Sequence, residues 1–312
     1  MNELLFSLNA VFPLLLIMTV GFLARRTKLV GEQGARDMDS CVYYIFLPLM
    51  LLFSFLDTGY GHAFDGKTMA FAFLATVAGF LFMFWLAPRL CPQRNARGVL
   101  VQATIRSNYA FFGIPLVLSI YPNADTGIAA MMIIVVVPVF NLCATIALML
   151  YGDEKMNLGK LLRGIVLNPL IIAMAIGMGM WALRLSLPPL LETPLRMMNR
   201  VASPLALFTL GASLDFGKAR ANRRLLTIGV VGKLIIAPAI FLPIAIALGI
   251  RGVPLATLVA VFASPTAVSS YPMARKMGGD AELAAAQIAL STAGSVVTVF
   301  LIVLLLKTVG CL

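Results

Sequence analysis

The sequence predicts an all-α integral membrane protein with ten transmembrane helices, arranged as a five-plus-five inverted repeat. Three observations carry this prediction: the apolar composition, the number of apolar stretches and a repeat at half the chain length. Of the 312 residues, 61% are hydrophobic and 12% are charged, and the mean hydropathy is +0.97. A soluble domain has about 45–50% apolar and about 25% charged residues. The composition therefore nearly excludes a water-soluble enzyme and makes the lipid bilayer a partner of the chain.

Ten apolar stretches are bounded by charged or turn residues, and about 20 residues are needed for one membrane crossing. Their limits are 5–24, 39–57, 68–87, 99–121, 127–151, 162–183, 201–215, 227–249, 253–275 and 283–307. The seventh stretch is short, and the fourth and ninth contain internal helix breakers. The first stretch lacks a basic leader and an A-x-A end, so we interpret it as a span rather than a signal peptide.

Lysine and arginine predict the orientation of the spans. Most of the 24 basic residues lie in the odd-numbered connections between stretches. Because basic connections stay on the cytoplasmic side, both termini are predicted to face outward. The same rule explains the net charge of +11, so no nucleic-acid partner is needed.

The residues that usually carry cofactor or catalytic chemistry are sparse. His62, the single histidine, lies in a short connection, and the four cysteines have no CxxC spacing. A His-ligated haem or zinc site, a Ser–His proteolytic pair and an HExxH motif are therefore not expected. No GxxxxGK[ST] sequence occurs, which disfavours ATP-driven transport. We predict that the chain has no cofactor or structural metal and is not an enzyme.

A shift of about 156 residues aligns the chain with itself. Gly21 then meets Gly177, Leu47-Pro48-Leu49 meets Ser203-Pro204-Leu205, and Ser107 with Pro115 meets Ser264 with Pro272. The two units are 1–155 and 156–312. Five spans per unit is an odd number, so the second unit is inverted, as in many secondary transporters. The alternative explanation for these matches is that Pro and Gly are abundant in membrane helices in general.

Helix breakers interrupt the fourth and ninth stretches near their middles. Proline frees backbone groups, which must find partners in protein or water rather than lipid, so both breaks are expected to face a polar cavity. Pro115 and Pro272 are expected in the first turns of the second half-helices, whose N-termini attract a carboxylate. The alternative is a pair of kinked helices whose Ser and Thr side chains satisfy their own backbone.

The candidate substrate-binding residues follow from these breaks and from two polar side chains in other spans. They are Asn108, Tyr109, Gly113, Pro115, Asn141, Lys233, Ser264, Pro265, Thr266, Ser269 and Ser270. Asn141 is assigned either to helix–helix bonding or to the cavity. For Lys233, as for Arg106 in the fourth stretch, snorkelling to the inner surface is the favoured role. The alternative is a basic vestibule for organic anions.

Several motifs along nearly the whole chain resemble the auxin efflux carrier family. The most specific is Ser107-Asn108…Gly113-Ile114-Pro115-Leu116. Weaker ones are Ser264-Pro265…Tyr271-Pro272, Gly232-Lys233-Leu234…Pro238-Ala239 and Pro204-Leu205-Ala206…Gly211-Ala212-Ser213-Leu214. The resemblance implies that helices four and nine cross at the substrate site, with Asn108 at the substrate. It also implies a scaffold part and a transport part formed across both repeats, elevator-like movement and, often, a homodimer.

The resemblance also suggests a substrate class. The central connection, 151–163, is short, unlike the long hydrophilic loop of many plant members. We therefore expect a bacterial organic-acid carrier of the inner membrane, with a small organic anion such as malonate or malate as its substrate. The alternatives are a sodium-coupled carrier of a larger amphipathic acid (auxin- or bile-acid-like), a channel and an intramembrane enzyme.

Coupling or gating residues are less sharply indicated. No Asp/Glu cluster resembles a sodium site, so coupling to H⁺, or no coupling, is at least as favoured as coupling to Na⁺. Asp57 is a candidate because an acidic residue recurs near this position in plant carriers. Asp215 and Arg106 are the other candidates, although ordinary interface placement is slightly favoured for Asp215.

Overall fold

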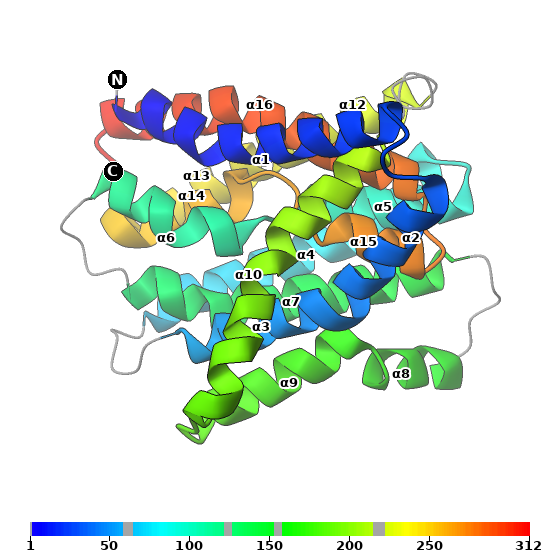
Figure 1. The fold of residues 1–312 in the computed structure, drawn as a ribbon. Helices are drawn as coiled ribbons and strands as arrows, with labels where there is room; N and C mark the ends of the chain where they lie inside the picture. Colours follow the sequence, from blue (N-terminus) through cyan, green and yellow to red (C-terminus); the bar gives the residue numbers. More distant parts are fainter. Residues whose placement is uncertain (1, 59–64, 122–126, 153–157, 215–221) are drawn as a thin grey trace.

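The computed structural model describes residues 2–58, 65–121, 127–152, 158–214 and 222–312 (Figure 1). The chain is all-helical, with 83% of its residues in helices and no strand in these ranges. The first half contains α1 (Asn2–Arg26), α2 (Glu32–Cys41), the π-helical turn η1 (Val42–Phe46), α3 (Leu47–Leu56), α4 (Gly66–Leu90), α5 (Arg94–Ile105), α6 (Tyr109–Ile120) and α7 (Gly127–Leu150).

The second half holds the remaining helices. It contains α8 (Leu158–Val166), α9 (Pro169–Ala182), α10 (Pro189–Ala212), α12 (Arg223–Val231), the π-helical turn η2 (Gly232–Ile236), α13 (Ala237–Ala247), α14 (Gly252–Ala263), α15 (Ser270–Lys276) and α16 (Ala281–Thr308). Both chain ends lie at the same end of the molecule (Figure 1).

Five helical segments in the described ranges are long and apolar enough to cross a membrane. They are Glu32–Leu56, Gly66–Leu90, Gly127–Leu150, Arg223–Ala247 and Ala281–Thr308. Shorter apolar helices, Pro169–Ala182 and Gly252–Ala263, lie among them. These lengths and compositions agree with the predicted integral membrane protein.

Three details of the predicted stretches are wrong. The seventh stretch is not short, because α10 begins at Pro189 rather than near residue 201. The sixth is not continuous, because Asn168 accepts a hydrogen bond from the Leu170 amide and caps α9, with Pro169 in its first turn. Pro115 does not begin the second half of the fourth stretch, because α6 already starts at Tyr109. Pro272 does lie in the first turn of α15, as predicted.

The helices pack in two groups that share one long contact. In the first group, α1 packs mainly on α10 and α3 packs mainly on α9, while α10 also contacts α3. The second group consists of α4 to α7 and α12 to α16, with α6 against α14 and α5 against α7. Helices α1 and α16 lie side by side and connect the groups (Figure 1).

Glycines permit the closest approaches in the first group. A Cβ atom on Gly21 of α1 would lie 2.0 Å from the carbonyl oxygen of Phe208 on α10. A Cβ atom on Gly177 of α9 would lie 3.1 Å from the carbonyl oxygen of Leu52 on α3. Small residues allow such backbone contact between helices in lipid, where packing replaces the hydrophobic effect.

Candidate functional site

The two interrupted stretches meet at their breaks. Ser107, between α5 and α6, forms an antiparallel β-bridge with Thr266, between α14 and α15. The backbone amide of Asn108 donates to the carbonyl of Pro265 at 2.8 Å. The backbone groups freed by the breaks therefore bond to each other in the protein interior, and the predicted interruptions of both stretches are confirmed.

Three hydroxyl groups at the crossing satisfy helix ends. The Thr266 hydroxyl donates to the carbonyl of Ala103 at 2.9 Å, in the last turn of α5. The Ser107 and Ser264 hydroxyls both donate to the carbonyl of Ala260 in the last turn of α14, at 3.2 and 2.5 Å. Such carbonyls have no partner within their own helix. These side chains therefore hold the crossing together rather than offering free donors to a ligand.

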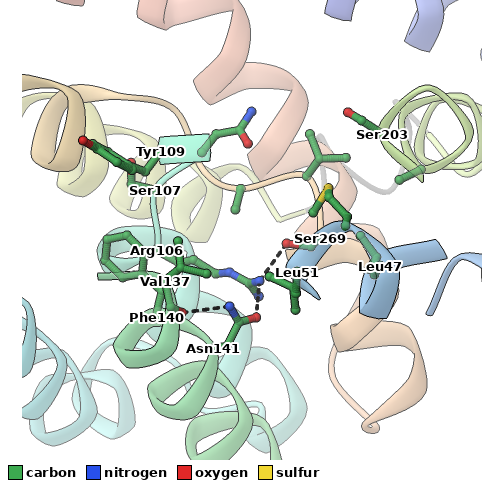
Figure 2. Close-up of a pocket in the computed structure, with 15 residues that line it drawn as sticks. Leu47, Leu51, Arg106, Ser107, Tyr109, Val137, Phe140, Asn141, Ser203 and Ser269 are labelled. Atoms are coloured by element: carbon green, nitrogen blue, oxygen red, sulfur yellow. Dashed lines mark hydrogen bonds between the residues drawn. The ribbon is translucent and has the colours of Figure 1, made fainter. Parts of the chain in front are cut away.

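A small cavity of about 40 Å³ lies beside the crossing (Figure 2). Its walls come from α3, both breaks, α7 and α10. The lining residues are Leu47, Met50, Leu51, Arg106, Ser107, Asn108, Tyr109, Val137, Phe140, Asn141, Ser203, Ala206, Ala267, Val268 and Ser269. We call this space the central cavity. Its lining is apolar apart from a few polar groups, and among the described residues that line it Arg106 is the one with a charged side chain.

The guanidinium of Arg106 is held in the central cavity by neutral groups. It donates to Asn141 Oδ1 and to Ser269 Oγ, each at 2.7 Å, and it contacts the sulfur of Met273 at 2.6 Å. The Asn141 amide donates to the carbonyl of Val137 at 2.8 Å, which turns its oxygen toward the arginine (Figure 2). Arg106 is 3% exposed and has no carboxylate partner among the described residues. The snorkelling expected for this side chain is therefore wrong, because polar side chains in the interior hold it.

Asn108 adds an unused donor to the same cavity. Its side chain is 5% exposed, and its Nδ2 atom has no hydrogen-bond partner. Leaving a buried amide unpaired costs about 1–3 kcal/mol. Asn108 also precedes α6 without capping it through its side chain, so the positive end of that helix dipole lies at the same place. These groups are therefore available to a hydrogen-bond acceptor.

A larger cavity, of about 450 Å³, lies next to the central one. The two share Met50 and Ser203 as lining residues, so we call the larger space the adjoining vestibule. Asp57 lines it and forms an ion pair with Arg196 at 2.8 Å, and Arg196 also bonds to Glu192 at 2.7 Å. Asp57 therefore lies in the vestibule and is half exposed, rather than beside the central arginine.

The remaining predicted residues are distributed around the crossing. Tyr109 lines the cavity, but its hydroxyl points away and donates to the carbonyl of Ala129 at 2.7 Å (Figure 2). The Ser270 hydroxyl is buried without a partner. Pro115 is exposed on α6, and Gly113 lies in the interior of that helix. Asp215 lies outside the described residues.

Lys233 is not part of the cavity lining. It lies in η2 and is 1% exposed, so it does not snorkel. Its ammonium has no hydrogen bond or ion pair to the described residues. The π-helical turn containing it packs against α5, α14 and α16.

Sequence reasoning missed Met273 and Ser203 as neighbours of the site. Neither carries a local signal, since one is an ordinary methionine after Pro272 and the other a serine in a long helix. Arg106 was noticed but assigned to the inner surface. The sequence does contain a usable signal for Arg106, because this residue is a cation within a predicted span and lies at a break that is expected to face a polar cavity.

The fold and site define an all-helical membrane protein with a cationic cavity at the crossing of two interrupted helices. The sequence profile of a family described as Membrane transport protein matches residues 6–303. The chain belongs to this family, which is the auxin efflux carrier family, and it is therefore a multi-pass membrane transporter. A search of curated proteins finds no match.

Proposed function

We propose that this protein is a secondary transporter of small organic anions and binds a substrate carboxylate between Arg106 and Asn108. The buried guanidinium carries the proposal. An unpaired buried charge is costly, and neutral acceptors from Asn141 and Ser269 compensate it only in part. A carboxylate would supply the missing negative charge in a bidentate geometry, and the free Asn108 amide would donate to it.

The size of the central cavity supports a compact substrate. About 40 Å³ of space favours a short acid, and we propose a dicarboxylate such as malonate or malate. The second carboxylate of such an acid would lie toward the vestibule. A larger amphipathic acid, of the auxin or bile-acid type, would require the apolar wall of Met50 and Leu51 to move.

Alternating access would follow from a five-plus-five inverted repeat of residues 1–155 and 156–312. Two pairs of contacts support it. Gly21 approaches Phe208, and Gly177 approaches Leu52; each partner of the first contact lies 156 residues from its counterpart in the second. Helix α1 thus packs on α10 as α9 packs on α3. A structure whose halves exchange roles has two states of similar energy that open to opposite sides.

The two helix groups suggest how the protein moves. We propose that α1, α2, α3, α9 and α10 form the scaffold part and that the other helices form the transport part, which carries the crossing in an elevator-like movement. Because both ends of the chain lie at one end of the molecule (Figure 1), and Arg275 and Lys276 lie at the inner end by the charge rule, we propose that both termini face outward from a bacterial inner membrane. A homodimer is a further part of this proposal.

Binding to the purified full-length protein tests the proposed substrate class. Melting temperature would be measured with malonate, malate, acetate and indole-3-acetate, each at two pH values and with or without Na⁺. We expect the dicarboxylates to raise the melting temperature of the parent but not of Arg106→Gln. Arg89→Gln removes an exposed charge outside the cavity and should retain the shift. An equal shift in the parent and in Arg106→Gln would reject the site.

Uptake into proteoliposomes then distinguishes a carrier from a channel. A carrier saturates with substrate concentration and exchanges labelled for unlabelled substrate, because each cycle moves one bound molecule. Imposed gradients of H⁺ or Na⁺ would identify the coupling ion. Uptake that increases linearly with concentration and shows no exchange would favour a channel.

A further inference from the structure

The short helix α15 contacts the substrate-binding arginine on one side and a separate polar cluster on the other. Ser269 and Met273, four residues apart, both contact Arg106. Tyr271 and Arg275, also four residues apart, lie about 200° around the helix from them. The two faces of this helix therefore have different partners.

The second face binds a buried carboxylate on α2. Asp39 is 0% exposed. Its Oδ2 atom accepts a hydrogen bond from the Tyr271 hydroxyl at 2.9 Å and lies 3.3 Å from Arg275 Nε. Arg275 also donates to the Tyr271 oxygen at 2.6 Å. The hydroxyl of Ser213, which follows α10, is hydrogen-bonded to Tyr271 as well. We call Asp39, Ser213, Tyr271 and Arg275 the α15 latch.

The latch joins the proposed scaffold part to the proposed transport part. Asp39 and Ser213 belong to the scaffold side, and Tyr271 and Arg275 belong to the transport side. Lys276 adds a further link, donating to Ser40 on α2 at 2.5 Å. Charge-assisted and buried hydrogen bonds of this kind are stronger than exposed ones. They hold α15 against α2 at the end of the molecule away from the termini (Figure 1).

A third cavity lies directly beyond α15. It measures about 540 Å³ and is lined by residues that include Tyr43, Tyr44, Lys276 and Met277. Within the part of the chain that the structure describes, it shares no lining residue with the central cavity, whereas the vestibule shares two. Ser269 at the start of α15 lines the central cavity, and Lys276 at its end lines the third cavity. Helix α15 therefore extends from one cavity to the other.

We propose that α15 is a gate for the end of the protein opposite the termini, and that an anion bound at Arg106 opens it. The inference rests on the proposed function, because the anion is the substrate carboxylate. A carboxylate at the guanidinium competes with Ser269 and Met273 for the same N–H groups. Their loss frees the face of α15 that meets Arg106. The helix then stays attached through the latch, the Lys276–Ser40 bond and the bond from the Gln102 amide to the Ser270 carbonyl. Substrate binding therefore weakens the closure toward the third cavity.

The gate can be observed through a cysteine placed at a buried position of α15 itself. Ser270 is 1% exposed on α15, and Ser270→Cys is nearly isosteric. The exposed native thiol is removed by Cys41→Ser. The rate at which a water-soluble maleimide labels the purified full-length protein then reports how often α15 opens. The protein without the reporter gives the background from the buried thiols.

Tyr271→Phe should label about tenfold faster than the parent, because one buried hydrogen-bonded hydroxyl is lost. Ser213→Ala removes the hydrogen bond between Ser213 and the Tyr271 hydroxyl. This variant replaces Tyr271→Phe in the test if Tyr271→Phe does not fold. Arg106→Gln should also label faster without any ligand. The matched control is Tyr151→Phe, which removes a tyrosine hydroxyl bonded to the Phe84 carbonyl at 2.7 Å and should label like the parent.

The results separate the gate from the substrate. Equal rates in Tyr271→Phe, Ser213→Ala and the parent would overturn the gate, as would a faster rate in Tyr271→Phe with an unchanged rate in Arg106→Gln. If malonate raises the melting temperature of the parent but does not speed its labelling, the proposal that a bound anion opens the gate is overturned. If no carboxylate binds while the three variants still label faster, the proposed function fails and the link between Arg106 and the latch stands.

Discussion

The backbone amide of Asn108 donates to the carbonyl of Pro265 at 2.8 Å, which fixes one residue from each interrupted helix at the same point in space. This single bond consumes two of the backbone groups that the helix breaks leave free. It also sets the position of the Asn108 side chain and of Arg106, two residues earlier. The geometry of the site thus depends on the pairing of two segments that lie far apart in the chain.

Arg106→Gln should abolish carboxylate binding without unfolding the protein. The substitution removes a buried charge that lacks an acidic partner among the described residues, so the desolvation cost falls as the ligand contact is lost. We expect affinity to drop by about 100-fold or more, with an unchanged or higher melting temperature in the absence of ligand. Calorimetry with malonate and thermal melting measure the two quantities. A large fall in the ligand-free melting temperature would assign Arg106 to structure instead.

Asn141→Asp should block the site by supplying a carboxylate from the protein. The new side chain would lie at hydrogen-bond distance from Arg106, since Asn141 Oδ1 already does. An internal ion pair would stabilise the fold and compete with the substrate. We expect weaker binding than in Asn141→Ala, together with a higher melting temperature. Stronger anion binding by Asn141→Asp than by Asn141→Ala would contradict the proposed role of Arg106.

Alanine at the packing glycines should destabilise the protein in a defined order. The Cβ atom would lie 2.0 Å from a backbone oxygen at Gly21, but at Gly177 the three nearest atoms lie at 3.1–3.2 Å. Gly179, on the same helix as Gly177, has nothing within 4 Å of the added atom. We therefore expect a large loss for Gly21→Ala, a smaller one for Gly177→Ala, and no loss or a gain of about 0.5–1 kcal/mol for Gly179→Ala. Thermal melting in detergent measures the order, and a loss at Gly179 as large as at Gly21 would refute the packing argument.

Asp57→Asn tests whether the vestibule carboxylate takes part in coupling. Its ion pair with Arg196 is partly exposed, so its contribution to stability should be below about 1 kcal/mol. If Asp57 exchanges protons during transport, the pH profile of uptake should flatten in Asp57→Asn. Uptake that keeps the parent's pH profile would remove Asp57 from the coupling scheme and leave it as a surface ion pair.

Local patterns in the sequence locate the interruptions of the fourth and ninth stretches, but they miss that of the sixth and do not assign every breaker. Pro272 starts a half-helix as predicted, whereas Pro115 lies well inside α6. A proline is tolerated within a membrane helix when neighbouring groups donate a hydrogen bond to the carbonyl that it leaves free. Whether such neighbours exist depends on packing, which a single segment does not encode.

The polar side chains at the crossing illustrate the same limit. Ser107, Ser264 and Thr266 bond to carbonyls of the opposite or preceding helix, while Ser269 faces the cavity. All four are small hydroxyl residues beside breaks, so composition alone does not separate them. Only the crossing decides which hydroxyls meet carbonyls and which meet the cavity.

The sequence by itself determined the membrane class and the interruptions of the fourth and ninth stretches, because these depend on composition and on breakers within a segment of about 20 residues. The tertiary structure decided the role of Arg106. Its partners, Asn141 and Ser269, lie 35 and 163 residues away, and contacts at such separations exist only once the helices have packed. The local sequence is the same for a buried arginine and for a snorkelling one. Acceptors supplied by neighbouring helices decide which of the two positions the side chain takes.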